Sequence, residues 1–296
     1  MLSVLKQRLP WWAKIWAKVM LARVPMAYGF WQRMELFRHG YMDSASYATD
    51  VFDSHVVRAG LEGRLRDKTL LEIGPGDSIA TAIIACSFGG RAILVDSGPY
   101  ARSDLQDYLP LCELLRARGL QPPDLSWART LQDVLSVSGA RYLTEGLASW
   151  RRIPSASVDF VFSQAVLEHV RKHEFFSTQQ ECRRVMRAGA IASHRVDLRD
   201  HLGGALNNLR FSARIWESPF FVRSGFYTNR VQCGAMLTLF EAAGFQVELG
   251  EIRRWPALPT PREALAAPFR DVADDELRIA GFDVLLRVDD TQSGKV

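Results

Sequence analysis

Between residues 67 and 197, short apolar runs alternate with stretches of helical pattern. This alternation is typical of a parallel sheet covered by helices on both faces, because parallel strands need long crossover connections. Right-handed crossovers make the sheet doubly wound and place ligand sites at the carboxyl ends of its strands. Strands are expected at residues 69–73, 91–95, 141–144, 158–163 and 190–196, a helix near 232–243, and strands near 245–252 and 281–288. The prediction is an α/β fold with a mostly parallel seven-stranded sheet.

The segment LLEIGPGDS joins the first expected strand to a helix through a glycine turn. A dinucleotide-binding loop reads G-x-G-x-x-G, but the third glycine position is occupied here by Ile79. Glu72 and Asp77 flank the place of a pyrophosphate, and two carboxylates there favour an amine-bearing ligand. Gly74 and Gly76 let the backbone approach such a ligand. A Gly-Pro-Gly turn can also join a strand to a helix without binding anything, so the loop is a candidate.

A further acid lies at the end of the second expected strand. The run RAILVD ends in Asp96, twenty residues beyond Gly76. A carboxylate at this place can accept hydrogen bonds from both hydroxyls of a ribose. Together the loop and Asp96 predict a nucleoside site.

Two later stretches, SVDFVFSQAVLEHV and ECRRVMRAGA, carry a family resemblance. They resemble the class I S-adenosylmethionine-dependent methyltransferases, in their methyltransferase type 11-like branch, and more specifically bacterial enzymes. The resemblance covers about residues 67–288 and implies the Rossmann-like fold of that class. The matching residues are Asp159, Gln164, Leu167, Glu168, His169 and Val170, and then, without the family's proline and one glycine, Arg184, Val185, Met186, Arg187, Ala188, Gly189 and Ala190.

The resemblance implies S-adenosyl-L-methionine as the cofactor and assigns its contacts. Glu72, Gly74 and Gly76 would contact the methionine portion, Asp96 the ribose, and Gln164 with its neighbouring backbone the sulfonium side. The family often has an aspartate near the adenine amino group, which this chain lacks, so adenine is held by apolar packing and backbone groups or by Glu145. The other expected cofactor residues are Pro75, Asp77, Ser78, Leu147, Ala148 and His169.

Catalytic residues are expected in HRVDLRDHLGG, which begins at His194 and leaves the fifth expected strand. A sulfonium methyl group is already activated, so transfer needs chiefly a nucleophile held in line in a water-poor pocket. A hydroxyl nucleophile also benefits from a base. His201 is the predicted base, with Asp197 or Asp200 orienting it and His194 as a further candidate, because the histidine pKa lies closest to working pH. No metal is expected to be needed. The same residues also suit an exposed polar turn.

Residues 207–230 mix amides, guanidinium groups and aromatic rings. Such a surface suits a polar acceptor, which we expect to be a small molecule, a glycan or a lipid-linked molecule. The segment suits equally well a lid that packs on the domain. The candidate acceptor-binding residues are Asn208, Arg210, Trp216, Tyr227, Asn229 and Arg230.

Positive charge is concentrated at the start of the chain. Residues 1–66 hold ten of the 37 Lys and Arg residues but only five of the 33 acids. The run LPWWAKIWAKVMLARVP has no acid and the pattern of an amphipathic helix. Through residues 1–24 it would contact an anionic membrane surface, or it would pack on the catalytic domain as a lid. The remainder is nearly neutral, which argues against a nucleic-acid partner.

The expected organisation is a basic, Trp-rich helical extension at 1–65 and a methyltransferase domain at 66–290. A substrate-side cap is expected at 197–231 and a disordered tail at 291–296. No apolar run of 18 residues occurs, and the first residues lack the pattern of a signal peptide. We therefore expect a cytoplasmic location, with a peripheral position at the inner face of the membrane as an option.

Two other functions remain open from the sequence. One is an NAD(P)-dependent oxidoreductase, which Ile79 and the acids flanking the loop disfavour. The other is a non-catalytic protein that binds S-adenosylmethionine and is recruited to a membrane by its basic helix. The favoured prediction is a methyltransferase that acts on a hydroxyl oxygen.

Overall fold

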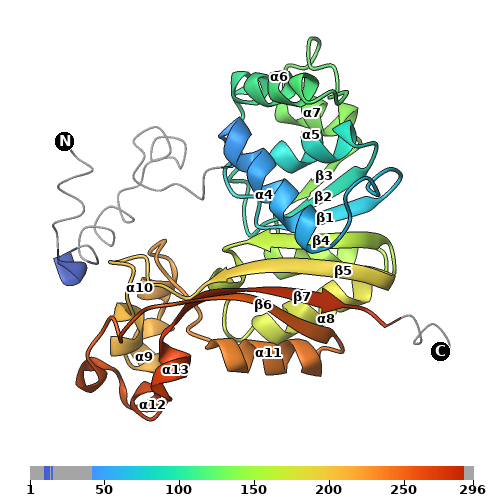
Figure 1. Ribbon diagram of the computed structural model, residues 1–296. Helices are drawn as coiled ribbons and strands as arrows, with labels where there is room; N and C mark the ends of the chain where they lie inside the picture. The colour runs from blue at the N-terminus through green and yellow to red at the C-terminus, as the bar shows by residue number, and fades with distance from the viewer. Residues whose placement is uncertain (1–9, 14, 16–41, 290–296) are drawn as a thin grey trace.

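The computed structural model describes residues 10–13, 15 and 42–289 of the chain (Figure 1). Its strands are β1 (Thr69–Ile73), β2 (Arg91–Val95), β3 (Arg141–Leu143), β4 (Val158–Gln164), β5 (Met186–Asp197), β6 (Gln246–Arg254) and β7 (Ile279–Arg287). The α-helices are α4 (Ala45–Arg58), α5 (Ala80–Ser87), α6 (Leu109–Ala117), α7 (Leu131–Val137), α8 (Phe175–Val185), α9 (Ala213–Trp216), α10 (Pro219–Val222), α11 (Cys233–Ala242), α12 (Ala267–Arg270) and α13 (Asp274–Leu277). Short 3₁₀ helices are η1 (Leu105–Tyr108), η2 (Gly146–Arg152), η3 (Leu167–His169), η4 (Asn207–Arg210) and η5 (Arg262–Ala264).

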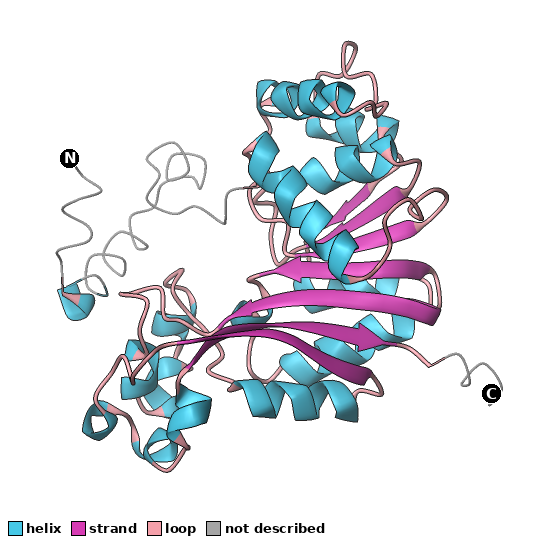
Figure 2. Cartoon of the chain, in the orientation of Figure 1, coloured by secondary structure: helices cyan, strands magenta, loops and turns pink. Residues whose placement is uncertain are grey.

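The strands form one seven-stranded sheet in the order β3-β2-β1-β4-β5-β7-β6. Strands β1 to β5 pair in parallel, and β7 runs antiparallel to both β5 and β6. Helices cover both faces of the sheet (Figure 2). This is the class I methyltransferase arrangement of a Rossmann-like fold, so the predicted fold class is confirmed. The carboxyl ends of β1, β2, β3 and β4 therefore lie along one edge.

The fifth strand is longer than the sequence predicted. It begins at Met186, which pairs with Val158 at the start of β4. Most of the second family-like stretch, residues 184–190, therefore lies within β5. Ala188 occupies the family's proline position, and it keeps the backbone N–H that proline would remove. Gly189 has a φ of 72°, so the irregular backbone remains at this point.

Successive strand residues bury their side chains in two separate cores. Leu70 of β1 packs among α4, α5 and α6 on one face, whereas Leu71 packs with α8 and α11 on the other. This alternation follows from the two-residue period of a strand. A strand that is buried on both faces reads as a continuous apolar run, which is why β1 and β2 could be placed from the sequence.

Helix α4 packs on the sheet, although it lies within the expected N-terminal extension. Phe52 stacks on Phe88, with ring centroids 5.8 Å apart, and meets the edge of Phe162 of β4 at 6.0 Å. Both Phe52 and Phe162 are almost completely buried. The packed core of the domain thus includes residues that precede position 66.

A second body of structure lies beyond the carboxyl end of β5 (Figure 1). We call residues 198–231 the cap; α12 and α13 lie beside it in the same body. Its aromatic cluster contains Trp216, Phe221 and Phe226, with Ile15 buried against it. Residues 11–13 and 15 are helical, and the rest of the expected amphipathic helix lies outside the described residues. The sequence pattern also favours a helix from Pro25 to Gly40, and that segment too lies outside them. Within the described ranges, no helix has the length and apolar character to cross a membrane.

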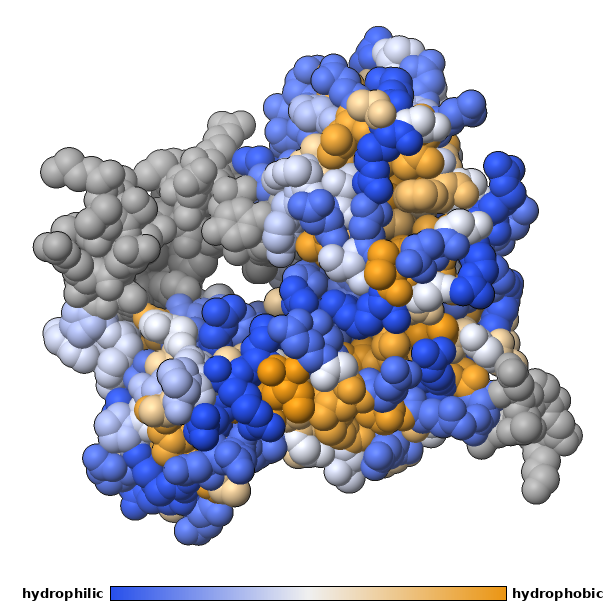
Figure 3. Space-filling view, viewed as in Figure 1, coloured by the Kyte–Doolittle hydropathy of each residue, from blue (hydrophilic) through white to orange (hydrophobic). Residues whose placement is uncertain are grey.

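Asp283 of β7 ties α4 to the sheet. Its carboxylate accepts hydrogen bonds from Arg58 of α4 at 3.0 Å, Arg195 of β5 at 2.9 Å and Arg253 of β6 at 3.1 Å. The Asp283 side chain is only 3% exposed. Figure 3 shows hydrophilic residues gathered over this part of the molecule, between α4 and β6. One buried carboxylate thus joins one helix and three strands.

Replacing Asp283 by Ala is expected to lower the free energy of unfolding by about 2–3 kcal/mol, because three guanidinium groups lose a shared acceptor. The loss stays below that of a fully buried pair since the arginine side chains are 20–35% exposed. Urea unfolding measures the change. Asp275→Ala, at an 88% exposed side chain, is the control and should change stability by less than about 0.5 kcal/mol. Equal effects of the two substitutions would contradict the assigned role.

Candidate active site

The loop after β1 is pressed against the segment that follows β4. Gly74 and Gly76 have positive φ angles of 71° and 64°. A β-carbon added at Gly74 would lie 2.5 Å from Cγ1 of Val166. A larger residue at Gly74 would therefore be strained and would displace Val166. This close approach brings the loops after β1 and β4 together at the carboxyl edge of the sheet.

Glu72 places a carboxyl group inside this edge. It lies near the end of β1 and is 2% exposed. Its Oε2 atom has no hydrogen-bond partner among the described residues. Burial raises the pKa of the Glu72 carboxyl to about 8; the nearby Thr81 hydroxyl opposes this shift and the charge of Asp96 adds to it. A buried oxygen of this kind can accept a hydrogen bond from an ammonium group.

Asp96 joins the loops after β1 and β2. Its Oδ2 atom accepts a hydrogen bond from the backbone N–H of Gly76 at 3.0 Å, and Oδ1 accepts one from Ser97 at 2.7 Å. Each carboxylate oxygen has a second lone pair, so Asp96 can still accept from a ligand hydroxyl. The side chain is partly exposed at the strand end, as a ribose contact requires.

The other residues of the glycine loop are buried. Ser78 accepts a hydrogen bond from the backbone N–H of Ala80 at 3.1 Å, and the carbonyl of Asp77 accepts one from Arg102 at 2.9 Å. Pro75 is also buried. Through these contacts the loop is held on the start of α5.

The turn after β3 lies beside Asp96. The backbone N–H of Gly146 donates to the Asp96 carbonyl at 2.9 Å. This bond brings Leu147, which is partly buried, and Ala148, which is exposed, to the same edge. The Glu145 carboxylate lies 3.6 Å from Arg152. Leu147, Ala148 and Glu145 therefore all lie in the turn beside Asp96.

His169 and His201 face each other where the segment after β4 meets the cap. Their Nε2 atoms are 3.0 Å apart, and the rings stack at 4.8 Å between centroids. Nδ1 of His169 lies 2.8 Å from the carbonyl oxygen of Tyr227. A carbonyl only accepts, so Nδ1 of His169 carries a proton and donates it. In a neutral His169 ring, Nε2 then accepts the hydrogen bond that the Nε2–H of His201 donates.

The two aspartates of the predicted catalytic cluster have separate roles. Both carboxylate oxygens of Asp197 accept hydrogen bonds from Arg199, at 2.9 and 2.7 Å. Burial alone would raise the pKa of Asp197, but these bonds outweigh it and hold the pKa below its ordinary value, with a smaller contribution from His201. Asp200 is buried and accepts from the backbone of Leu202 and Gly203 at 2.8 and 2.7 Å. It shapes the turn that carries the exposed His201.

His194 lies in the core between the sheet and α11. It is 0% exposed, and its Nδ1 is 2.8 Å from the Ser163 hydroxyl. The ring stacks on Phe240 of α11 at 6.3 Å. Burial, aided by the charges of His55 and Arg58, lowers the pKa of His194 to about 3. A ring enclosed in this way does not reach an acceptor, so His194 is not placed to act as the base.

Three of the expected acceptor-binding residues hold the cap together. The buried Trp216 donates its indole N–H to the carbonyl of Thr228 at 2.7 Å. Asn229 donates to the carbonyl of Leu167 at 2.8 Å, which fixes the cap to the segment after β4. Arg230 is 7% exposed and donates to the carbonyl of Phe211 at 2.7 Å.

The remaining three lie between the cap and its neighbours. Tyr227 donates its hydroxyl to Glu217 at 2.9 Å. Arg210 is partly exposed and lies over the ring of Trp11 at 4.9 Å. Asn208 is buried, and its Oδ1 atom has no partner within the described residues. Arg210 is the most accessible polar group of the predicted set.

Two residues near the site had no role assigned from the sequence. His55 of α4 lies 3.1 Å from Gln164 through Nε2 and Oε1. Glu168 is 1% exposed, and neither carboxylate oxygen has a partner in the described part of the chain. It lines a cavity of about 10 Å³ together with Asn208 and Arg230, which is room for about one water. The L-E-H-V motif contains Glu168, but no local pattern could have singled out His55.

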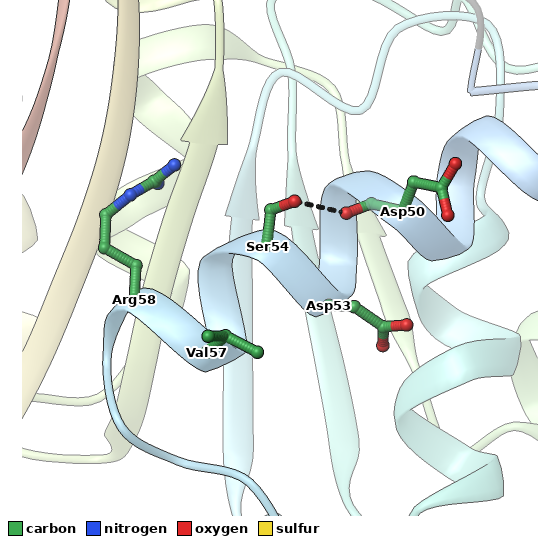
Figure 4. A pocket seen from close by; sticks show the side chains of 5 residues that line it. All are labelled: Asp50, Asp53, Ser54, Val57 and Arg58. Atoms are coloured by element: carbon green, nitrogen blue, oxygen red, sulfur yellow. Dashed lines mark hydrogen bonds between the residues drawn. The ribbon is translucent and has the colours of Figure 1, made fainter. Parts of the chain in front are cut away.

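A shallow pocket of about 540 Å³ lies on the outer side of α4. Figure 4 shows the residues that line it, which are Asp50, Asp53, Ser54, Val57 and Arg58. None of them belongs to the carboxyl edge of the sheet. The site therefore consists of the edge and the adjoining cap.

Comparison with known proteins gives this site its class. Residues 71–193 match a family model described as a methyltransferase domain. The matched range contains Glu72, Asp96 and Gln164. Residues 71–193 therefore form a methyltransferase domain, and together with the sheet order this confirms the predicted enzyme class and its cofactor, S-adenosylmethionine. The oxidoreductase alternative is set aside.

Solved structures give weaker likenesses. A methyltransferase from Methanosarcina mazei is 17% identical with a TM-score of 0.45, covering 76% of this chain and 94% of its own. One from Archaeoglobus fulgidus is 12% identical, with a TM-score of 0.42 and coverage of 80% and 93%. One from Mesorhizobium loti is 15% identical, with a TM-score of 0.42 and coverage of 75% and 92%. No curated protein sequence matches the chain. The acceptor is therefore not indicated by these relatives.

The hydrogen-bonding groups at the carboxyl edge of the sheet fit S-adenosylmethionine. The unpartnered Oε2 of Glu72 suits an amino group, and the partly exposed carboxylate of Asp96 at the end of β2 suits ribose hydroxyls. The backbone of the glycine loop lies close to both Glu72 and Asp96. When bound, S-adenosylmethionine supplies a methyl group on a positively charged sulfur.

Cofactor binding at pH 7 is expected to release about one proton, because Glu72 is mostly protonated when alone and ionises against the ammonium group. Affinity should then rise by up to about tenfold per pH unit below pH 8. Titration calorimetry in two buffers of different ionisation enthalpy measures the proton. Glu72→Gln should abolish its release, whereas Glu62→Gln, at an exposed loop position, should not. The same proton release in both variants would contradict the role of Glu72.

Proposed function

We propose that this protein transfers a methyl group from S-adenosylmethionine to a hydroxyl oxygen of a small-molecule, glycan or lipid-linked acceptor. The observation that carries the proposal is the paired His169 and His201, which places an exposed imidazole where the cap meets the segment after β4. A hydroxyl is a weak nucleophile and gains most from such a base.

On the cofactor side, residues of the chain bind S-adenosylmethionine and orient its methyl group. Glu72 accepts from the amino group, Asp96 from the ribose hydroxyls, and Gln164 lies on the side of the reacting methyl. Leu147 and Ala148 cover the adenine. Pro75, Asp77 and Ser78 keep the loop in shape, and Gly74 and Gly76 let its backbone approach the ligand.

On the acceptor side, His201 takes the proton of the hydroxyl group. Its Nε2–H donates to His169, so the proton-accepting nitrogen is Nδ1. His169 is held in turn by the carbonyl of Tyr227. The negative charge of Asp197 favours the protonated form of His201. The two groups are close enough to interact, because His201 lowers the pKa of Asp197. A positioned base of this kind contributes about a hundred- to ten-thousand-fold in rate.

The cap supplies the remaining acceptor contacts in this proposal. Arg210 is partly exposed and can pair with an anionic or hydroxyl-rich group. Asn208 has an unpartnered oxygen toward the cavity beside Glu168. Trp216, Tyr227, Asn229 and Arg230 keep the wall of the site in place through the contacts described above, and Asp200 does the same for the turn that bears His201.

We keep as a proposal the expected extension at 1–65, the catalytic domain at 66–290 with a cap at 197–231, and the tail at 291–296, with α4 of the extension packed on the domain core. It also keeps a cytoplasmic location with contact to an anionic membrane through residues 1–24. Trp11 and Ile15 pack against the cap, which supports the lid role for that part. Co-sedimentation with anionic vesicles tests the membrane contact, and equal binding by a chain without residues 1–24 would contradict it.

The test of the proposed reaction uses tritiated-methyl S-adenosylmethionine with separated small-molecule, glycan and lipid fractions of a cell extract. Label in an alkali-stable ether of one fraction is the expected result. Label on nitrogen or carbon would overturn the choice of acceptor atom. Cofactor binding without any labelled product would favour the non-catalytic alternative.

His201→Ala is expected to lower kcat with the labelled fraction by about a hundredfold or more, because the base is lost. The dissociation constant of S-adenosylmethionine should change by less than about twofold, since His201 does not bind the cofactor in this account. His173→Ala is the matched control, because its side chain is 67% exposed, and it should leave both values unchanged. An unchanged kcat in His201→Ala would contradict the assignment.

A further inference from the structure

His55 connects α4 to the end of β4 through a buried polar chain. Its ring is 0% exposed. Nδ1 lies 2.8 Å from the Ser193 hydroxyl and 3.1 Å from a guanidinium nitrogen of Arg58. Nε2 lies 3.1 Å from Oε1 of Gln164. A buried histidine therefore bridges the arginine cluster and a residue of the cofactor edge.

The neighbours of His55 determine which ring nitrogen carries the proton. An arginine nitrogen donates and never accepts, so Nδ1 of His55 must face Arg58 with its lone pair. Burial, followed by the positive charge of Arg58, lowers the pKa of His55 to about 3, and the ring is neutral at pH 7. A neutral ring with a lone pair at Nδ1 carries its proton at Nε2. Nε2–H therefore donates to Gln164 Oε1.

The arginine in this chain is itself held in place. Arg58 donates to the buried carboxylate of Asp283 at 3.0 Å, and Arg195 donates to the same carboxylate. Arg58 also donates to Ser193 at 3.0 Å. Rotation of Arg58 away from His55 would break these bonds. Asp283 thus holds Arg58 in place, and Arg58 in turn determines that His55 carries its proton at Nε2.

Gln164 is oriented as a result. With Oε1 turned toward His55, the amide NH₂ group points away from the helix. It forms no hydrogen bond with any residue in the described ranges, and it is not among their buried, unpartnered atoms. Gln164 is the last residue of β4, so its NH₂ group lies at the accessible carboxyl edge. A donor is presented there instead of an acceptor.

We propose that His55 is a positioning residue, which fixes the Gln164 amide so that its N–H donates a hydrogen bond to an oxygen of the methyl acceptor. This inference rests on the proposed function and narrows it to acceptors that place an oxygen beside Gln164. A sulfonium is cationic and gains nothing from an N–H donor, whereas a hydroxyl or carbonyl oxygen does. Orientation of the acceptor contributes to rate because the reacting atoms must be aligned.

Two substitutions distinguish the contacts made by Nε2 of His55 from those made by Nδ1. His55→Gln keeps an N–H donor near the position of Nε2 and so can still hold Gln164. His55→Asn keeps a polar atom near Nδ1, facing Ser193 and Arg58, but has nothing that reaches Gln164. Ser54→Ala is the control on the same helix: Ser54 is exposed, and its hydroxyl donates to the carbonyl of Asp50 (Figure 4).

The first measurement is nitrogen NMR of the histidine rings in the ¹⁵N-labelled full chain, with the His55 signals identified by their loss in His55→Gln. The neutral form protonated at Nε2 is expected at pH 7. A ring protonated at Nδ1, or a charged ring, would overturn the proposal. This measurement needs no acceptor, so it is independent of the proposed reaction.

The second measurement is methyl transfer to the extract fraction that the unchanged protein labels. His55→Asn should raise KM for the acceptor or lower kcat by about three- to tenfold, as expected for one lost hydrogen bond, and His55→Gln should restore most of this. The dissociation constant of S-adenosylmethionine should stay within about twofold in both His55 variants. Gln164→Ala should show the same higher KM or lower kcat as His55→Asn. The double variant with both substitutions should transfer methyl groups no more slowly than Gln164→Ala alone.

Equal loss in His55→Asn and His55→Gln, or parallel loss of cofactor binding, would assign His55 a merely structural role and overturn the proposal. No transfer by the unchanged protein would overturn the proposed function and with it this role, while the NMR result on the ring would still stand.

Discussion

The contact between Gly74 and Val166 is the constraint on which the geometry of the site depends. Strands β1 and β4 are parallel neighbours, so their loops leave the sheet at the same edge. The absence of a side chain at Gly74 lets these loops touch. Glu72 and Gln164 are thereby held at one place, and the bond from Gly76 to Asp96 adds the end of β2. Residues from three strands form one site because of this packing.

The segment after β4 also organises the acceptor side. Asn229 donates its side-chain amide to the carbonyls of Leu167 and Val170, and its backbone N–H donates to the backbone carbonyl of Glu168 at 2.7 Å. His169 then bonds to the carbonyl of Tyr227. The cap is thus fixed to the segment after β4, beside the proposed point of methyl transfer.

The sheet and the cofactor edge could be predicted from the sequence because their signals are local. Glu72 and Asp96 stand at the ends of apolar runs, and that position alone brings them to one edge. His194 and Val196 lie two residues apart in β5 and so share one face of the strand, where both are buried. The alternation of residues along β5 does not predict that α11 covers this face of the strand. The burial of His194 depends on Phe240, far along the chain.

The parts that could not be predicted depend on partners distant in sequence. His55 and Gln164 are 109 residues apart, and Arg58 and Asp283 are 225 apart. Neither pair has a local signature, since a histidine and an arginine on an amphipathic helix are ordinary surface residues. The pairing of His169 with His201 likewise arises only when the cap folds back. Long-range packing, and not residue type, determines which of these groups act together.

The most direct test of this account is a crystal structure of the chain with S-adenosylhomocysteine. The amino group is expected within hydrogen-bond distance of Glu72, and the ribose hydroxyls within hydrogen-bond distance of Asp96. The sulfur atom should lie on the side of Gln164, facing His201. A nucleoside bound away from Glu72 and Asp96, or a sulfur that faces away from the cap, would contradict it.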